Sequence, residues 1–141
     1  MGFNEFGIVS FVPFSKVGEF TKYLKEGTLK GKICKHCNIF YFPPRSECPE
    51  CLGIDMDWAE SNGIGTLLTY TTIHAAPTGF ETLAPYTIGL IQLDEGGRLL
   101  ALIEGLKEIE IKIGMKLKAV PKKLENERIS YQLEPLEKRN Q

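Results

Sequence analysis

The chain has 141 residues, a length that suits one ordinary domain or two small ones. Its apolar fraction of 43% and charged fraction of 25% are typical of globular domains, and no apolar run approaches the ~20 residues that a membrane-spanning helix needs. The formal net charge of -1 disfavours a nucleic-acid binder, because phosphate contacts require a basic footprint. The opening segment has neither a basic start nor a cleavage-site pattern, so we expect no signal peptide and a cytoplasmic location.

Residues 1–28 are predicted to form an N-terminal helical segment. Residues 1–14 are rich in aromatic and β-branched side chains, which need a surface to pack on, in this chain or in another. Ser15 can cap a helix, and Gly27 is suited to end it. Between them, apolar residues recur at three- and four-residue spacings: Val17, Phe20, Tyr23 and Leu24. We therefore expect a helix from about residue 15 to residue 26.

All four cysteines lie in two Cys-x-x-Cys pairs: Cys34, Cys37, Cys48 and Cys51. Each pair can form a tight turn that directs both sulfurs to one point, and two facing turns make the tetrahedral thiolate cage of a structural zinc site. The segment between the pairs is somewhat shorter than the ~15–20 residues of the common pattern, yet long enough for a compact ribbon. Two disulfides, or four buried thiols, are the alternatives. Disulfides are disfavoured because reducing compartments keep thiols free.

Zinc is the first choice for this metal site, and iron in a rubredoxin-like site is the runner-up, because four thiolates in a tetrahedron suit either ion. Four protein ligands leave no open position for substrate or water, so the metal is predicted to be structural. His36, between the first two cysteines, is interpreted as a solvated turn residue.

The segment around the cysteines is predicted to form a zinc ribbon over residues 29–60. Strands are expected at residues 28–33 and 39–42, and residues 56–60 lead out of the ribbon. Trp58, the only tryptophan, is expected to pack the ribbon against the domain that comes after it in the chain.

Residues 61–136 show the periodicity of strands, and residues 137–141 are expected to be a frayed tail. The strands are predicted at residues 65–75, 86–93, 98–104, 115–121 and 129–133. Residues 77–85 form a loop, residues 94–97 have hairpin chemistry, and residues 106–113 fit either a strand or a short helical turn. Five strands in this order favour a Greek-key barrel of the OB-fold type, whereas a β-sandwich needs more strands. The predicted fold class is therefore mainly β.

The ribbon and barrel carry several short motifs that resemble a known family. The matching residues are 29–34, 42–45, 48–51, 63–66, 78–80, 85–86, 93–96 and 113–115. Together they span residues 29–121 and resemble the zinc-ribbon/OB-fold proteins associated with acyl-CoA enzymes, long catalogued as a domain of unknown function. The sequence departs from the commonest pattern at Asn38 and Leu52, where a glycine often follows each cysteine pair.

The resemblance implies an N-terminal helical segment, a rubredoxin-like zinc ribbon and a C-terminal five-stranded OB-fold barrel. It also implies a non-catalytic partner of thiolase-like enzymes. Some members bridge a thiolase and a hydroxymethylglutaryl-CoA synthase and help to hold the CoA moiety, while others accompany hydratases or aldolases. We accordingly expect an adapter that binds acyl-CoA and a larger acyl-CoA enzyme.

CoA offers phosphates, an adenine and a thin pantetheine arm, each of which needs a different surface. The candidate ligand residues are Lys32, Lys35 and Arg45 for the phosphates, Phe42 for the adenine, and Gly79, Phe80 and Tyr86 for a groove along the loop. Two of these have ordinary alternatives. Arg45 can be a solvated surface residue, and Phe42 can face the core of the ribbon.

No catalytic residue is assigned. The sequence holds no nucleophile elbow, no phosphate-cradling glycine loop and no metalloprotease motif, and all of its cysteines are assigned to the metal. The alternative function is a single-stranded nucleic-acid module, because OB barrels and zinc ribbons recur in that role. The net charge and the family motifs favour the adapter.

Overall fold

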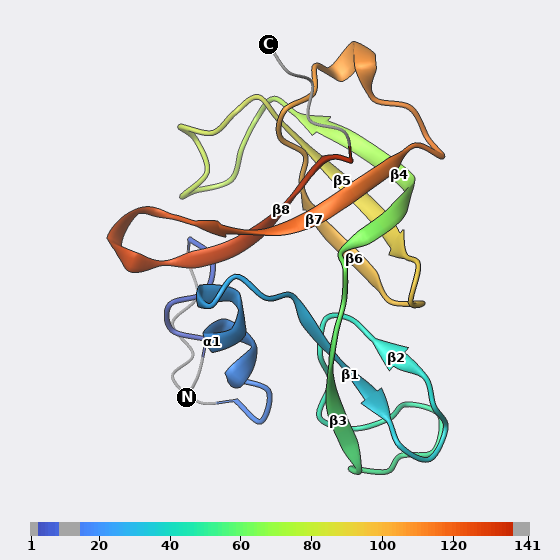
Figure 1. Cartoon of the computed structure of the whole chain (residues 1–141). Coiled ribbons are helices and arrows are strands. Elements are labelled where there is room, and N and C mark those ends of the chain that lie inside the picture. The colour runs from blue at the N-terminus through green and yellow to red at the C-terminus, as the bar shows by residue number, and fades with distance from the viewer. Residues whose placement is uncertain (1–2, 9–14, 137–141) are drawn as a thin grey trace.

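The computed structural model describes residues 3–8 and 15–136 and divides them into a barrel, a small ribbon and one helix (Figure 1). The predictions for residues 1–2, for residues 9–14 and for the frayed tail at 137–141 lie outside the described residues. Within the described ranges, no helix is long and apolar enough to cross a membrane. The predicted fold class, mainly β with an N-terminal helix, a ribbon and a five-stranded OB-fold barrel, is confirmed.

Helix α1 spans Glu19–Lys25 and is shorter than the sequence predicted. The Ser15 hydroxyl accepts a hydrogen bond from the Val17 backbone N–H at 3.2 Å, so this residue stabilises a preceding turn rather than the helix itself. The helix ends where predicted, because Gly27 adopts a φ of 86°, which a glycine reaches without strain. Its buried side chains, Phe20, Thr21 and Leu24, share one face.

The ribbon is a three-stranded sheet with strand order β2-β1-β3. Its antiparallel strands are β1 (Lys30–Cys34), β2 (Phe40–Tyr41) and β3 (Met56–Glu60). Trp58 packs against the hydrophobic core that the ribbon shares with the barrel, and its ring also meets the edge of the Tyr23 ring of α1, with centroids 5.1 Å apart. The ribbon is therefore braced by the helix that precedes it.

The barrel sheet has the strand order β6-β5-β4-β7-β8. The strands are β4 (Ile64–Ile73), β5 (Tyr86–Leu93), β6 (Arg98–Leu102), β7 (Lys116–Lys123) and β8 (Ile129–Pro135). The register of β4 against β5 shifts between Leu67 and Thr69, a bulge that helps a long strand to curve. Ile103, directly after β6, forms a parallel bridge with Leu133 of β8, which is the one bridge between these two edges of the sheet among the described residues.

Two short 3-10 turns connect the later strands. Residues 106–113, which the sequence left open, contain the turn η1 (Glu108–Glu110) and no strand. The second turn, η2 (Glu125–Glu127), lies at the tip of the predicted β7–β8 hairpin.

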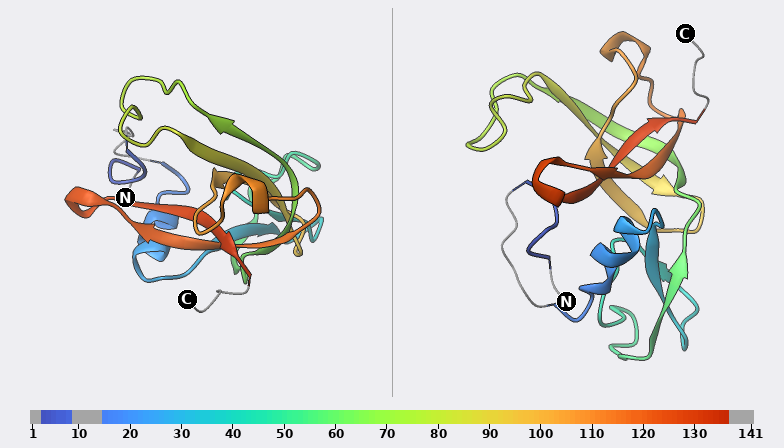
Figure 2. Two further views of the ribbon diagram at one scale, coloured as in Figure 1. Left: turned by 90° about the horizontal axis from the view of Figure 1, so that it is seen from above. Right: turned by 60° about the vertical axis from the view of Figure 1, so that its left-hand side comes forward.

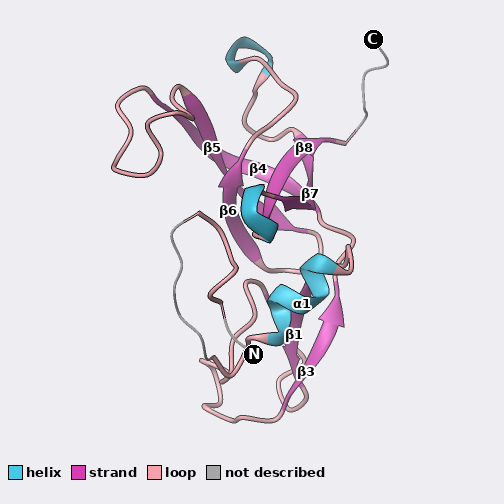
Figure 3. Ribbon diagram, turned by 90° about the vertical axis from the view of Figure 1, so that its left-hand side faces the viewer, coloured by secondary structure: helices cyan, strands magenta, loops and turns pink. Residues whose placement is uncertain are grey.

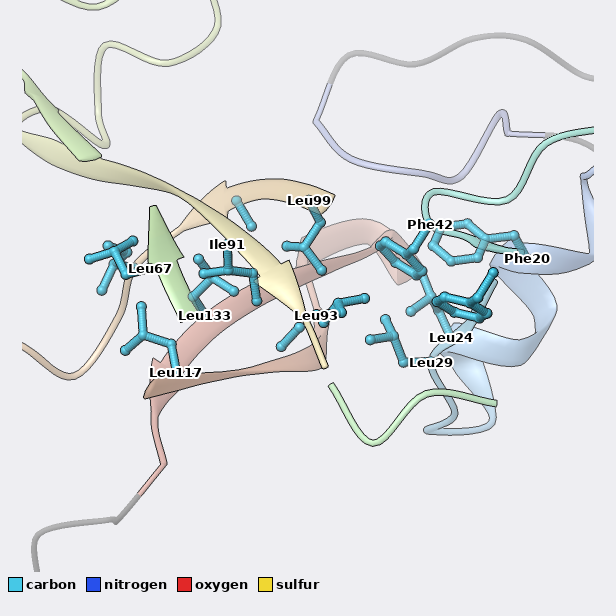
Figure 4. Close-up of a cluster of buried hydrophobic side chains, with 14 of the residues drawn as sticks. Phe20, Leu24, Leu29, Phe42, Leu67, Ile91, Leu93, Leu99, Leu117 and Leu133 are labelled. Atoms are coloured by element: carbon cyan, nitrogen blue, oxygen red, sulfur yellow. The ribbon is translucent and has the colours of Figure 1, made fainter. Parts of the chain in front are cut away.

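One hydrophobic core runs from the barrel to helix α1 (Figure 4). Leu67, Ile91 and Leu133 fill the barrel, while Phe20, Leu24 and Phe42 continue the core toward the ribbon. Helix α1 lies below the β7–β8 hairpin and beside β1 (Figures 1 and 3). The two β units are therefore joined by shared packing as well as by the chain.

Hydrogen bonds also connect the ribbon to the barrel at their junction. The Glu95 carboxylate, in the β5–β6 turn, accepts hydrogen bonds from the Ser61 hydroxyl at 3.0 Å and the Asn62 backbone N–H at 3.1 Å. Beside it, a Cβ added at Gly97 would lie 2.7 Å from the Phe42 Cβ and 2.8 Å from the Phe42 backbone nitrogen. The barrel turn and the ribbon thus approach so closely that only glycine fits.

We predict that Gly97→Ala lowers the free energy of unfolding by about 1–3 kcal/mol, because the added methyl overpacks a backbone contact. Chemical denaturation measures this change. Arg98→Ala, at an exposed position in the same turn, is the control and should change stability by less than about 0.5 kcal/mol. Equal stability of Gly97→Ala and the wild type would contradict this close packing.

Candidate metal centre and apolar groove

The four cysteine sulfurs converge in the ribbon. All four Sγ atoms lie within 4.8 Å of one another, with Cys34 and Cys48 buried. A tetrahedral zinc site with Zn–S bonds of ~2.3 Å has sulfur–sulfur edges of about 3.8 Å. The Cys34 and Cys51 sulfurs are 3.7 Å apart, which matches such an edge. These four residues could therefore hold one zinc ion.

Both cysteine pairs are built on the same backbone turn. In the first, the Asn38 N–H donates to the Cys34 carbonyl at 2.7 Å; in the second, the Leu52 N–H donates to the Cys48 carbonyl at 2.8 Å. The residues after each pair, Asn38 and Leu52, have φ values of 57° and 59°. Although neither residue is a glycine, the two turns have the same conformation. All four sulfurs remain in the cluster.

The surroundings of the sulfurs shift their acidities in opposite directions. The Tyr41 hydroxyl, 3.5 Å from the Cys48 sulfur, and nearby backbone N–H groups lower the pKa of Cys48 to about 6. The sulfur of Cys51 and burial raise the pKa of Cys37 to about 12. Crowded thiols cannot all ionise without a cation among them. A metal ion would remove this conflict by binding all four as thiolates.

We predict that the purified protein contains one equivalent of metal and that Cys34→Ser reduces this content and lowers the melting temperature. A strong chelator should unfold the ribbon while the barrel strands persist, because structural zinc supplies about 10–16 kcal/mol of apparent folding energy to such small units. Elemental analysis and circular dichroism measure both effects. His36→Ala is the control and should keep the metal. Full metal content and an unchanged melting curve in Cys34→Ser would refute the ligand assignment.

A second feature is an apolar groove of about 590 Å³ on the barrel. It lies between β6 and β8, where the barrel is not closed, and the loop after β4 and the first described residues border it. Its apolar lining includes Phe6, Ile73, Phe80, Tyr86, Leu100 and Tyr131. A groove of this size, with few polar groups, is typical of small-molecule sites.

Three polar side chains also line the groove. Glu104 and Lys122 form an ion pair at 3.7 Å on its wall. The Gln132 side chain donates from Nε2 to Glu134 at 2.8 Å, while its buried Oε1 has no hydrogen-bond partner among residues 3–8 and 15–136. An unsatisfied buried acceptor costs about 1–3 kcal/mol. Because this oxygen has almost no accessible surface, a ligand could meet it only after the side chain turns toward the groove.

The predicted ligand residues divide between the loop that connects β4 to β5 and the ribbon, and most of this loop lies away from the ribbon (Figures 1 and 2). Phe80 and Tyr86 line the groove, with ring centroids 6.3 Å apart. Gly79, with a φ of 95°, lies in the same loop, where its N–H donates to Glu81 at 2.8 Å. The other residues lie on the ribbon.

The candidate residues on the ribbon differ in how much of each side chain a ligand can contact. Phe42 is a correction: it is 5% exposed, and its ring packs against Phe20 and Tyr131, so it cannot stack on an adenine. The Lys32 ammonium lies 4.7 Å from the centre of the Trp58 ring. Arg45 is exposed.

Lys35 has two carboxylate neighbours. Its ammonium lies 3.4 Å from both Asp55 and Asp57, and the hydrogen bond to Asp55 is the main reason that the pKa of Lys35 is raised. This lysine can still offer its remaining surface, since the side chain is half-exposed.

Sequence reasoning missed the β8 side of the groove. Gln132 and Lys122 sit in ordinary strand patterns, and their placement beside Phe80 depends on how the barrel closes. No local signal in the sequence distinguishes them from surface residues. His74, to which no catalytic role was assigned, lies near a second hollow of about 410 Å³ that shares Leu83 and Tyr86 with the first.

Two family models match consecutive parts of the chain. Residues 21–57 match the rubredoxin-like zinc ribbon domain of ChsH2, and residues 58–122 match the C-terminal OB-fold domain of ChsH2. The two matches meet where the ribbon strand β3 begins to lead into the barrel.

Relatives of known description extend this similarity. A DUF35 domain-containing scaffold protein of Methanocaldococcus jannaschii is 34% identical over 124 residues, which cover 82% of this chain and 88% of the relative. The benzoylsuccinyl-CoA thiolase subunit BbsA of Thauera aromatica is 32% identical over 61% of this chain and 63% of its own length. The solved Ltp2-ChsH2(DUF35) aldolase superposes with a TM-score of 0.75 and 27% identity, over 87% of this chain and 97% of that chain.

Proposed function

Since this chain belongs to the family of ChsH2 and the DUF35 scaffold proteins, we propose that it is a non-catalytic adapter of a thiolase-like acyl-CoA enzyme. In this role it docks on the enzyme and helps to hold or pass CoA thioesters. The observation that carries the proposal is the apolar groove beside Phe80 and Tyr86, in a protein whose relatives include a scaffold protein and a thiolase subunit.

The groove suits the pantetheine arm and acyl group of a CoA thioester. Both are thin and largely apolar, and the arm carries amide N–H groups. If the Gln132 side chain turns toward the groove that it lines, its amide oxygen can accept a hydrogen bond from one of them. Phe80 and Tyr86 supply the aromatic wall, and Gly79 permits the chain to come close to a bound arm.

The phosphates of CoA remain assigned, as a proposal, to the cationic residues of the ribbon. Arg45 is the best of these, because it is exposed and forms no ion pair with any described residue. Lys32 and Lys35 are secondary, since each already has a neighbour, the Trp58 ring and the Asp55 and Asp57 carboxylates. The groove adjoins the ribbon through the contact between Phe42 and Tyr131, so we propose that the arm lies in the groove and the phosphates face the ribbon.

We propose zinc as the ion held by Cys34, Cys37, Cys48 and Cys51. Its role is to fix the ribbon, because four protein ligands leave no position for a substrate. The nucleic-acid alternative has less support: the groove is apolar, and its one described lysine, Lys122, faces Glu104.

The partner can be tested directly. Tagged protein recovered from its native cells should bring down a thiolase-like or related acyl-CoA enzyme, identified by mass spectrometry. The recovery should resist nuclease treatment. An unrelated tagged OB-fold protein is the control for adhesion to the matrix. Recovery of RNA without any acyl-CoA enzyme would reject the adapter.

The ligand site can be tested with acetyl-CoA and the assembled complex. Phe80→Ala should weaken binding by roughly tenfold, because it removes an aromatic wall worth about 1–2 kcal/mol, and Arg45→Ala should weaken it in a salt-dependent way. Isothermal calorimetry measures both. Ile113→Ser, at an exposed position outside the groove, is the control. Wild-type affinity in Phe80→Ala would remove the groove from the proposal, and wild-type affinity in Arg45→Ala would remove that residue.

A further inference from the structure

Three apolar residues next to the cysteine turns of the ribbon are exposed. They are Ile39, Leu52 and Ile54, which are 40%, 77% and 77% exposed and which come after the two cysteine pairs in the chain. We call these three residues the knuckle patch. Their backbones are tied to the cysteine turns, because the Ile39 carbonyl accepts from the Cys34 N–H at 3.0 Å and Leu52 donates to Cys48. The patch is therefore held by the same scaffold as the metal.

Leu52 is the unusual member of the patch. It occupies a left-handed conformation, with a φ of 59°, in which a bulky side chain is strained and a glycine is not. Its side chain is 77% exposed, so the strain is not offset by packing within this chain. The corresponding position of the first turn, Asn38, holds a residue type that tolerates this conformation well. Backbone strain of this kind is typical of functional positions.

The charges around the patch indicate the kind of surface that can cover it. Exposed acidic residues lie close to Leu52 and Ile54 in the chain: Glu47, Glu50, Asp55 and Asp57. Two of these carboxylates share the single ammonium of Lys35. A complementary surface therefore has an apolar depression bordered by basic side chains. Because the cysteine turns are rigid, such a contact costs little conformational entropy.

We propose that the knuckle patch, with Leu52 at its centre, is the surface by which this chain docks on its acyl-CoA enzyme. The inference rests on the proposed function and names the contact on which the adapter role depends. The leucine fills an apolar depression on the enzyme, and the acidic side chains meet basic ones around it. This contact would bury the Leu52 side chain, which is exposed in the chain by itself.

The test compares variants that separate folding from docking. The probe is the acyl-CoA enzyme recovered with the wild-type chain, then purified by itself. Leu52→Gly should weaken its binding about ten- to thirtyfold, as loss of a buried interface anchor does. The same variant should keep its metal and show an unfolding midpoint no lower than that of the wild type, because the glycine relieves the strain.

Two controls make the result specific. Asn38→Gly makes the same backbone change in the first turn without removing an apolar side chain, and it should bind as the wild type does. Leu52→Met keeps an apolar side chain of similar volume and should retain most of the affinity. Added salt should weaken the wild-type complex, because the charges around the patch are solvent-exposed.

Equal enzyme affinity in the wild type and Leu52→Gly would overturn this inference and leave the proposed function intact. Failure of the wild-type chain to recover any acyl-CoA enzyme would overturn both. Self-association of the wild-type chain that Leu52→Gly abolishes, seen in analytical ultracentrifugation, would assign the patch to a second copy of this chain and also overturn the inference. A photo-crosslinker at position 54 that links to the enzyme supports it.

Discussion

The convergence of four sulfurs on one point is the constraint on which the rest of the ribbon depends. The ribbon sheet has one strand of only two residues, β2, and a sheet this small has little stability of its own. Its shape is fixed by the pair of matched turns that bring Cys34, Cys37, Cys48 and Cys51 within 4.8 Å of one another. Once these turns are set, the directions of β1 and β3 are set as well. The side chains next to the cysteines are then presented outward on a rigid base.

Aromatic packing connects this rigid end to the barrel. Phe42 leaves the ribbon after β2, and its ring meets Phe20 of α1 and Tyr131 of β8 at centroid distances of 5.7 and 5.6 Å. Phe6 joins the same cluster through Tyr131, at 5.9 Å. Arg128 holds the first described residues in place by donating hydrogen bonds to the carbonyls of Asn4 and Phe6 at 3.1 and 3.0 Å. The helix, the ribbon and the barrel therefore share one core, and these rings are the packed route between the metal end and the groove.

The sequence predicted the parts of this fold that depend on local pattern. Strand β5 was predicted with the bounds that the structure has, because its residues are bounded by a loop and a hairpin turn. The two cysteine pairs predicted the sulfur cluster, because their spacing is itself the geometry. The helix began later than predicted, since Ser15 can stabilise a turn as well as a helix end, and only tertiary packing decides between them. Phe42 was assigned to a ligand because an aromatic residue in a short strand shows no preference for either face until the partner surface is known.

The groove could not be predicted from the sequence, because no motif marks it. It forms where strands β6 and β8 do not pair with each other. Strands β6 and β8 meet only near Ile103 and Leu133, and the width of the gap beyond that bridge depends on the curvature of five strands together. Gln132 lines this gap, and its buried amide oxygen has no partner among the described residues. None of the three knuckle-patch residues lines this groove. The two proposed roles, docking through the patch and ligand binding in the groove, therefore rest on different residues and can be tested by separate substitutions.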